Sequence, residues 1–285
     1  MAADPPRWFA DIEAALGAKP LRRSPLSGGS IACVDRVELA DGRSVVAKTG
    51  ASGLALEGEM LGYLAEHSDL PVPRVFLTRD DLLVMEHLPG STHLDSSSQA
   101  HAAELLAALH ECTSATFGFH RDTVIGGLLQ PNPETEAWIP FFRDHRLLYM
   151  ARDCHAAGSL PSAMLARLEH FAGKLDGLLE EPDRPSLVHG DMWGGNILSD
   201  KGRITGFLDP AIYYAHAEIE LAFSTLFGTF GEAFFERYHG LRPIDPGFFE
   251  SRKDIYNLWH LLTHVRLFGP SYLGGVERVL ARHGV

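Results

Sequence analysis

Residues 189–196 read His-Gly-Asp-Met-Trp-Gly-Gly-Asn, and residues 208–210 read Leu-Asp-Pro. An apolar pair precedes the first stretch, so Asp191 is expected to leave a buried strand at the start of a loop. Asn196 follows Asp191 by five residues, and Asp209 follows Asn196 by thirteen. Kinase-type sites use an aspartate, an asparagine and a second aspartate in this order. The pattern therefore predicts a phosphoryl-transfer site.

Each of these groups has its own expected role. Asp191 would orient the acceptor hydroxyl and take its proton, a contribution of about 10²–10⁴ in rate. Asn196 and Asp209 offer amide and carboxylate oxygens, the hard ligands that Mg²⁺ prefers. Trp193 either packs beside the acceptor or belongs to the core, and the sequence leaves both interpretations open.

An upstream glycine pair and a lysine supply a candidate nucleotide site. Gly28 and Gly29, followed by Ser30, would let backbone N–H groups approach phosphates, although an ordinary hairpin turn has the same composition. Lys48 ends the apolar strand predicted over residues 44–48 and is the expected partner of the α- and β-phosphates. No complete Rossmann or P-loop motif occurs, which disfavours those folds.

A helix predicted over residues 54–67 carries two candidate partners for Lys48, namely Glu57 and Glu59. Only one of them can face the lysine, because residues two apart on a helix diverge by about 200°. Farther along, Met85, Glu86 and Leu88 lie where a predicted strand leaves the sheet. Their backbone could pair with an adenine edge, with Met85 beside the base, or the segment could be an ordinary strand end.

The order of predicted elements is typical of an α+β protein. Strands are expected over residues 31–39, 44–48, 74–77 and 82–85, with one helix among them. After residue 98 the chain is expected to be mainly helical, with helices that include residues 134–154 and 254–268. We therefore predict an N-terminal nucleotide-binding lobe over 1–87 and a C-terminal catalytic and substrate-binding lobe over 88–285. A cleft between them is the expected nucleotide site.

Composition excludes several classes of function. The 285 residues carry a net charge of −12, which argues against non-specific nucleic-acid binding. No run of about 20 apolar residues predicts a membrane span. The three cysteines are far apart, so neither a zinc site nor a disulfide framework is indicated. With an N-terminus that does not read as a secretory signal, these features predict a cytoplasmic protein.

Several motifs together resemble the fructosamine kinase (ketosamine-3-kinase) family, whose kinases are aminoglycoside-phosphotransferase-like with a two-lobed, protein-kinase-like fold. The family reads H-G-D-L-W-S-G-N and D-P-A where this chain has residues 189–196 and 209–211. Residues 213–222 resemble Y-Y-G-H-x-E-x-D/E-L-A, and residues 259–264 resemble Y-H-L-L-N-H. The likeness covers nearly the whole chain.

The resemblance implies further residue roles. Glu59 fits the family pattern F-E-x-E better than Glu57, and M-E-x-L favours the adenine reading of residues 85–88. Glu220 would accept backbone N–H bonds from the catalytic loop. His216, Glu218 and Trp259 become candidate substrate contacts beside Trp193, although His216 and Glu218 fit a structural role at least as well.

The resemblance also implies an activity. It would be phosphorylation of the 3-hydroxyl of a ketosamine (a fructosamine or ribulosamine) with ATP and Mg²⁺, followed by release of the amine from an unstable product, which is deglycation repair. Ser30 departs from the family, because other members have aspartate or cysteine there. The alternatives are a kinase of another small hydroxylated amine or sugar, such as an aminoglycoside or choline, and a nucleotide-binding regulator without turnover. The sugar, its amine carrier and the oligomeric state stay open.

Overall fold

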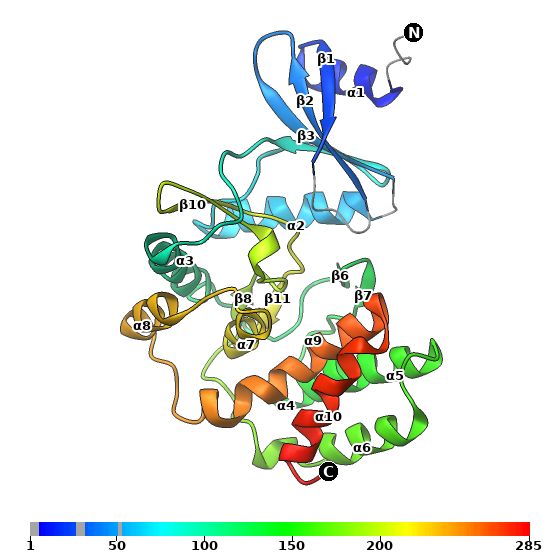
Figure 1. Ribbon diagram of the computed structural model, residues 1–285, viewed down its shortest axis with the longest axis vertical. Helices are drawn as coiled ribbons and strands as arrows, with labels where there is room; N and C mark the ends of the chain where they lie inside the picture. Colours follow the sequence, from blue (N-terminus) through cyan, green and yellow to red (C-terminus); the bar gives the residue numbers. More distant parts are fainter. Residues whose placement is uncertain (1–5, 27–31, 51–52) are drawn as a thin grey trace.

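The N-terminal part of the chain is built on a five-stranded antiparallel sheet with the order β1-β2-β3-β5-β4 (Figure 1). The structure is a computed structural model that describes residues 6–26, 32–50 and 53–285. The strands are β1 (Pro20–Pro25), β2 (Cys33–Leu39), β3 (Ser44–Thr49), β4 (Val75–Arg79) and β5 (Leu82–Glu86). This confirms the antiparallel sheet expected from the sequence.

The two faces of this sheet are covered by different helices. Helix α1 (Trp8–Leu16) packs on the face that carries Val45, and α2 (Leu54–His67) packs on the face that carries Val46. Because successive side chains of a strand point to opposite faces, Lys48 lies on the same face as Val46. The lysine is thereby directed toward α2.

The N-terminal part holds two helices where one was expected. Helix α2 begins and ends at the predicted residues because its apolar positions recur at helical spacing and residues 71–73, Pro-Val-Pro, follow it closely. Helix α1 is only 9 residues long, and it follows a proline pair near the N-terminus. Its apolar residues Trp8, Ile12 and Leu16 recur at helical spacing, a signal that the prediction of a single helix did not use.

The rest of the chain is mainly helical, with short strand pairs that carry the loops of interest (Figure 1). Its elements are α3 (Ser96–Leu109), β6 (Thr123–Ile125), β7 (Leu128–Gln130), α4 (Trp138–Phe142), η1 (Arg143–Leu147), α5 (Leu148–Ala156), α6 (Ser162–Ala172), η2 (Leu175–Gly177), β8 (Ser186–Val188), η3 (Gly194–Asn196), β9 (Ile197–Asp200), β10 (Arg203–Phe207), β11 (Tyr213–Ala215), α7 (Glu218–Leu226), α8 (Glu232–Leu241), η4 (Phe248–Arg252), α9 (Lys253–Phe268), η5 (Pro270–Tyr272) and α10 (Leu273–Arg282).

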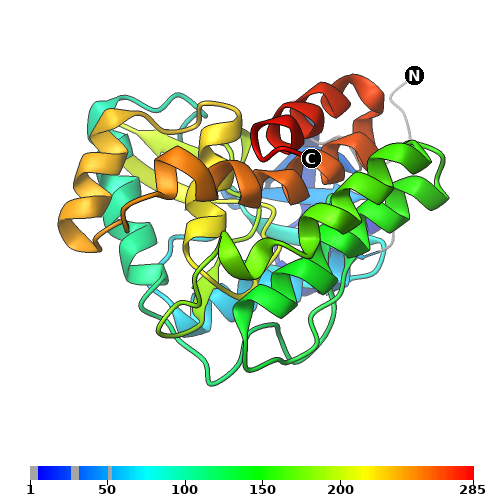
Figure 2. The ribbon, with the colours of Figure 1, turned by 90° about the horizontal axis from the view of Figure 1, so that it is seen from below.

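The helices of this part pack in two groups, which Figure 2 shows from below. One group holds α5, α6, α9 and α10, and the other pairs α3 with α8. Helix α7 packs against α9. One continuous apolar cluster runs from α3 to α10. None of the helices in the described residues has the length and apolar character needed to cross a membrane.

A π-helical turn breaks the helix that the sequence predicts over residues 134–154. The turn η1 separates α4 from α5, and it carries Arg146 into the core, where the side chain has no solvent exposure. The guanidinium lies over the rings of Tyr213, at 3.9 Å, and Trp259, at 5.2 Å, and it donates to the carbonyl of Pro131. Aromatic faces and carbonyl oxygens thus surround the buried charge.

Candidate active site

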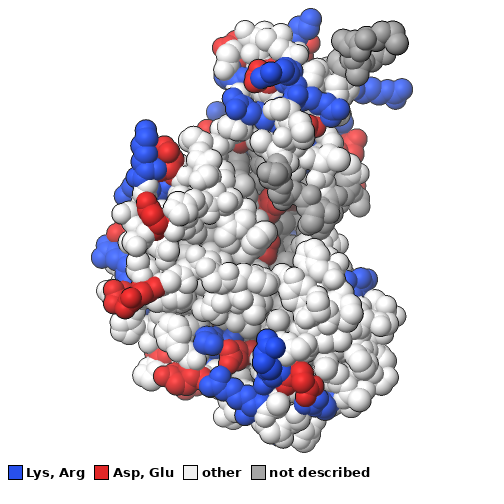
Figure 3. Space-filling view, in the orientation of Figure 1, with Lys and Arg blue, Asp and Glu red and all other residues white. Residues whose placement is uncertain are grey.

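A cavity of about 1000 Å³ opens between the sheet and the helical part. Figure 3 shows the hollow in the middle of one face of the molecule, with acidic atoms inside it. Lys48 and Glu57 line it from the N-terminal side, and Asp191, Asn196 and Asp209 line it from the C-terminal side. The structure therefore brings the lysine and the three polar groups of the sequence pattern to one place.

Lys48 is buried between two carboxylates. Its Nζ donates to Oε1 of Glu57 at 2.7 Å and to Oδ1 of Asp209. Burial lowers the pKa of Lys48, but the two carboxylates outweigh burial and raise it above the ordinary value. Burial also raises the pKa of Glu57, against the attraction of the lysine. The ammonium is therefore charged and held in place by carboxylates on both sides of the cavity.

The expectation that Glu59 holds Lys48 is wrong in this structure, and Glu57 takes that place. Glu59 points the other way and forms an ion pair with Arg121, with about half of its side chain exposed. The helical rotation of about 200° between the two positions separates them, and α2 turns Glu57 toward the face of β3 that carries Lys48. The sequence alone could not set this rotation.

Asp191 lies in a loop whose backbone is constrained at each step. The loop leaves β8, and Gly190 has φ 85°, a left-handed conformation. A Cβ at Gly190 would also lie within 3.0 Å of the Ala211 carbonyl, so no other residue fits there. The backbone N–H of Asp191 donates to Nδ1 of His189 at 3.3 Å. The carboxylate is thereby aimed into the cavity from a rigid turn.

The surroundings of Asp191 suit a group that takes up a proton. Burial raises its pKa to about 7, while a hydrogen bond from Nδ2 of Asn196 to Oδ2, at 2.8 Å, lowers it and the charge of Asp209 raises it. A carboxylate with a pKa near neutrality is a better general base than an ordinary aspartate. The sequence predicted Asp191 as the base, and its burial in the folded chain is the main cause of the raised pKa.

Asn196 and Asp209 have oxygens that fit a magnesium ion. Nδ2 of Asn196 is bonded to Asp191, so Oδ1 is the amide atom left to face a cation. Asp209 has φ 54° and holds its carboxylate in the cavity, 42% exposed. No cluster of three or more histidine, cysteine or acidic residues that could hold a metal occurs among the described residues. One carboxylate and one amide are a sparse set typical of Mg²⁺, which keeps waters and substrate oxygens as its other ligands.

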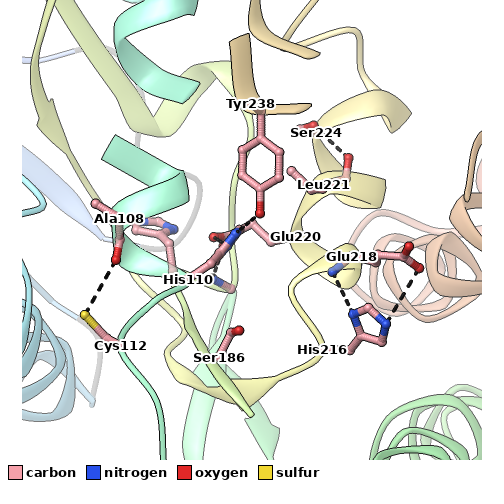
Figure 4. A network of polar contacts seen from close by, with 12 residues as sticks. Ala108, His110, Cys112, Ser186, His216, Glu218, Glu220, Leu221, Ser224 and Tyr238 are labelled. Atoms are coloured by element: carbon pink, nitrogen blue, oxygen red, sulfur yellow. Dashed lines mark hydrogen bonds and ion pairs between the residues drawn. The ribbon is translucent and has the colours of Figure 1, made fainter. Parts of the chain in front are cut away.

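A buried acid braces the Asp191 loop from behind. Oε1 of Glu220 accepts the backbone N–H of Gly190 at 2.8 Å, and Oε2 contacts Nε2 of His110 at 2.9 Å. His110 continues to the hydroxyl of Tyr238 at 2.6 Å (Figure 4). Burial raises the pKa of Glu220, but these contacts outweigh it and lower the pKa below the ordinary value. The structure therefore has the contact expected of Glu220.

The structure describes only some of the residues predicted to contact the nucleotide. Gly28, Gly29 and Ser30 lie outside the described residues. The backbone N–H of Glu86 donates to the carbonyl of Arg74, the residue before β4, so this N–H is not available to an adenine edge. Met85 packs in an apolar cluster with Val46 and Leu54, and Leu88 packs against Gly206. None of the three lies among the described residues that line the cavity, and their adenine role stays a prediction.

Of the predicted substrate contacts, only Trp193 lines the cavity, and its side chain is 41% exposed. The other three are corrected by the structure. Trp259 is buried against Arg146, and Glu218 forms a buried ion pair with Arg252 at 2.6 Å. His216 accepts the backbone N–H of Glu218 at the start of α7. These three side chains are buried and already have partners within the protein, which sequence spacing could not reveal.

The structure adds an aromatic wall that the sequence reasoning did not assign to the site. It consists of Phe227, His264, Phe268 and Tyr272, all lining the cavity. The ring of His264 lies 4.8–5.5 Å from the other three ring centres. His264 belongs to the motif over residues 259–264, from which no role at the site was predicted for it. The available signal was its helical spacing with Phe268, which places both on one face of α9.

Comparison with known proteins agrees with this geometry. A sequence model of the fructosamine kinase family matches residues 10–283. A Synechocystis protein named probable ketoamine kinase is 40% identical over 181 residues, which are 61% of this chain and 58% of that protein. The chloroplastic protein-ribulosamine 3-kinase of Arabidopsis thaliana is 33% identical over 269 residues, or 90% of this chain and 80% of that protein.

Solved structures show the same fold. The crystal structure of a Thermobifida fusca protein assigned as a fructosamine-3-kinase has a TM-score of 0.87 at 28% identity, covering 97% of this chain and 99% of that one. The α+β, kinase-like architecture expected from the sequence is thereby confirmed. Use of a nucleotide as phosphoryl donor comes with a kinase family. The chain belongs to the fructosamine kinase family of phosphotransferases.

Proposed function

We propose that this protein transfers the γ-phosphoryl group of ATP to the 3-hydroxyl of a ketosamine, as a deglycation repair enzyme. The observation that carries the proposal is the meeting of Asp191, Asn196, Asp209 and the Lys48–Glu57 pair on one cavity. Phosphoryl transfer needs little more from a protein than positioning and charge stabilisation, which these groups supply.

Each side chain has a separate task in this reaction. Asp191 orients the acceptor hydroxyl and takes its proton, and Lys48 holds donor phosphates with Glu57 keeping the ammonium in place. Asn196 and Asp209 would hold Mg²⁺, which neutralises phosphate charge when it is bound. We assign nucleotide binding to residues 1–87 and catalysis and acceptor binding to residues 88–285.

The acceptor end of the cavity favours a ketosamine over an aminoglycoside. Among the described lining residues, the carboxylates are Glu57, Asp191 and Asp209, and all three belong to the catalytic end. The far end holds Trp193 and the aromatic wall, with no acidic residue in the described lining. A polycationic acceptor would need further carboxylates. A sugar with a single amine needs a ring surface to stack on, and relatives named ketoamine and ribulosamine kinases fit that class.

The test is ADP release by the purified protein with Mg-ATP and a panel of acceptors: a ribulosamine, a fructosamine, an aminoglycoside, choline and none. We expect turnover with the ketosamines only. In Asp191→Ala, kcat should fall about 10²–10⁴-fold while ATP binding is retained.

Other outcomes of this test would change the proposed acceptor, the proposed activity or the role of Asp191. Turnover with another amine or sugar alone would keep the site and overturn the acceptor. ATP binding without turnover on any acceptor would favour a nucleotide-binding regulator. Equal loss of turnover and ATP binding in Asp191→Ala would contradict its role as the base.

A further inference from the structure

Asp209 has a backbone conformation that its neighbours must hold in place. Its φ of 54° lies in the left-handed region, which residues with a side chain rarely adopt and which persists only where the surrounding structure fixes it. On one side, the backbone N–H of Leu208 donates to the carbonyl of Asn196 at 2.9 Å. On the other side, the backbone N–H of Ala211 donates to the carbonyl of His189 at 2.8 Å. The direction of the Asp209 carboxylate therefore depends on how firmly these flanking residues are held.

A buried glutamine holds the segment that follows Asp209. Gln130 is only 2% exposed, and its Nε2 donates to the carbonyl oxygen of Ala211 at 3.0 Å and to the hydroxyl of Thr123 at 2.8 Å. Its Oε1 has no hydrogen-bond partner in the described part of the chain. Because a carbonyl oxygen can only accept, the amide must turn its nitrogen toward Ala211.

Thr123 extends this contact into a buried network. Its hydroxyl donates to the carbonyl of Ile212 at 3.4 Å and accepts Nε2 of Gln130 and Nδ2 of Asn132, both at 2.8 Å. A hydroxyl has one donor and two acceptor sites, so all three are used. Oδ1 of Asn132 in turn accepts Nη2 of Arg146 at 2.5 Å. The network therefore runs from the buried guanidinium to two successive carbonyls beyond Asp209.

The hairpin that carries Gln130 is itself held in place. Gln130 of β7 and Thr123 of β6 are paired across the hairpin. Its turn consists of Gly126 and Gly127, with φ of 55° and 78°, as in the tight type I′ turn. A Cβ on Gly126 would lie within 3.0 Å of Cδ1 of Leu267, so the turn packs closely on α9. The amide of Gln130 thus projects from a rigid element.

The carbonyl that Gln130 holds also touches the loop of the base. It packs so closely on Gly190 that a Cβ there would lie within 3.0 Å of the oxygen of Ala211. Gly190 directly precedes Asp191, and Ala211 lies two residues after Asp209. One hydrogen bond from Gln130 therefore acts at the point where the segments of both carboxylates meet.

We propose that Gln130 is a positioning residue, which acts through the carbonyl of Ala211 to hold Asp209 in the orientation that binds Mg²⁺ with the nucleotide. The proposal rests on the proposed function for the metal and the nucleotide. Gln130 is not among the described residues that line the cavity, so it would touch neither of them.

The test is Gln130→Met, which keeps an unbranched side chain of similar length and removes the donor. The first readout is calorimetric binding of ATP with Mg²⁺ and with EDTA. The ratio of the two Kd values should fall toward that of Asp209→Asn, while Kd in EDTA stays that of the parent because Lys48 is untouched. The second readout is ADP release at saturating ATP and ketosamine, in which the Mg²⁺ concentration for half-maximal rate should rise about 10-fold, as is typical when a group that orients a metal ligand is removed.

Asn257→Leu is the matched control for the loss of a buried amide. Asn257 is 5% exposed, its Nδ2 donates to the hydroxyl of Thr225 at 3.3 Å, and its Oδ1 has no partner among the described residues. This variant should lower Tm and keep the metal dependence of the parent. A Gln130→Met variant that lowers Tm in the same way and leaves both metal readouts unchanged would overturn the proposal, because Gln130 would then be structural only.

Thr123→Val decides the question if Gln130→Met folds poorly. It keeps the shape of the side chain and removes the hydroxyl that bonds Ile212 and Gln130. It should shift the ratio of Kd values in the same direction, and an unchanged ratio would overturn the proposal.

The calorimetric readout needs no acceptor, which separates this inference from the proposed function. Absence of ketosamine turnover in the parent would reject the function even if Mg²⁺ strengthens ATP binding. Parent turnover on ketosamines, together with an unchanged ratio in the variants, would reject the role of Gln130 alone.

Discussion

At the scale of single residues, the partner of Lys48 can be tested directly. Glu57 and Glu59 both lie on α2, but Glu57 pairs with Lys48 in the cavity and Glu59 forms a surface pair. Glu57→Gln should lower kcat/KM for ATP about 10²-fold, since the ammonium would lose the group that sets its position. The measurement is steady-state ADP release at varied ATP.

Glu59→Gln is the matched control, two residues along the same helix. Its pair with Arg121 is exposed, and such pairs contribute about 0–1 kcal/mol, so kinetics should stay within about twofold of the parent. A larger loss in Glu59→Gln than in Glu57→Gln would show that the pairing seen here is not the one used in catalysis.

The sequence could predict those site residues whose positions are set by their nearest elements along the chain. Asp191 and Asp209 each follow a short strand, and Asn196 follows within the same loop, so spacing brings them together. The direction in which a helix side chain points could not be predicted, because the choice between Glu57 and Glu59 depends on how α2 packs on the sheet. Trp259 was misplaced for the same reason, as only the folded chain shows that it covers Arg146.

At the scale of elements, the brace behind the Asp191 loop links β8 to α7 and α8. Glu220→Gln should lower the free energy of unfolding by about 1–3 kcal/mol, because a buried hydrogen-bonded acid loses its charge. It should also lower kcat more than it raises KM for ATP, since Gly190 precedes Asp191 while Lys48 is untouched. Urea unfolding and steady-state kinetics measure the two effects.

The control for this brace is Ser224→Ala, also on α7, whose hydroxyl bonds only within the helix. It should leave kcat near the parent value. If Glu220→Gln altered stability and left kcat unchanged, the contact would be structural and without influence on the loop.

His216, at the start of α7, predicts a loss of stability in mild acid. Burial and the nearby charge of Arg252 lower its pKa to about 3, from an ordinary 6.5. The unfolded chain therefore takes up this proton below pH 6.5 while the folded chain does not until about pH 3. Stability should fall as the pH drops through that window, by about 1.4 kcal/mol per pH unit from this residue.

The measurement is urea unfolding between pH 7 and pH 5 for the parent and His216→Asn, whose amide oxygen can accept the same N–H from Glu218. The variant should show a shallower pH dependence. Identical slopes would mean that the folded protein protonates His216 at an ordinary pH.

Elements with strong periodicity were predictable, and several short ones were not. Residues 54–67 and 253–268 carry clear helical patterns and fold as α2 and α9. The three-residue strands β6, β7 and β11 have no pattern long enough to recognise. Residues 134–154 look like one helix because a π-helical turn has the same composition as an α-helix. The reason for the π-helical turn, which is the burial of Arg146, is visible only in the folded chain.

At the scale of the whole molecule, polar contacts join the N-terminal part to the helical part, and one of them crosses the cavity. Tyr63 of α2 meets Tyr214 of β11 at 3.0 Å between hydroxyl oxygens, and Lys48 reaches Asp209. The donor phosphates and Mg²⁺ would bind at this junction, so a bound nucleotide should stabilise both parts together.

Mg-ATP at 100 times its Kd should therefore stabilise the protein by about 2.7 kcal/mol, which raises Tm by several degrees. ATP with EDTA should give a smaller shift, and Asp209→Asn should reduce the difference between the two conditions. Differential scanning calorimetry measures it. Equal shifts with and without the metal would argue against Asp209 as a magnesium ligand.

The π-helical turn at residues 143–147 makes the length of this segment as important as its composition. A residue added to or removed from a helix rotates everything beyond it by about 100°. Deleting one residue here would restore a regular helix, and it would also swing Arg146 away from Tyr213 and Trp259 or turn α5 off its neighbours α6 and α9. This short stretch therefore acts as a spacer of fixed length, tolerant of some substitutions and intolerant of any insertion or deletion.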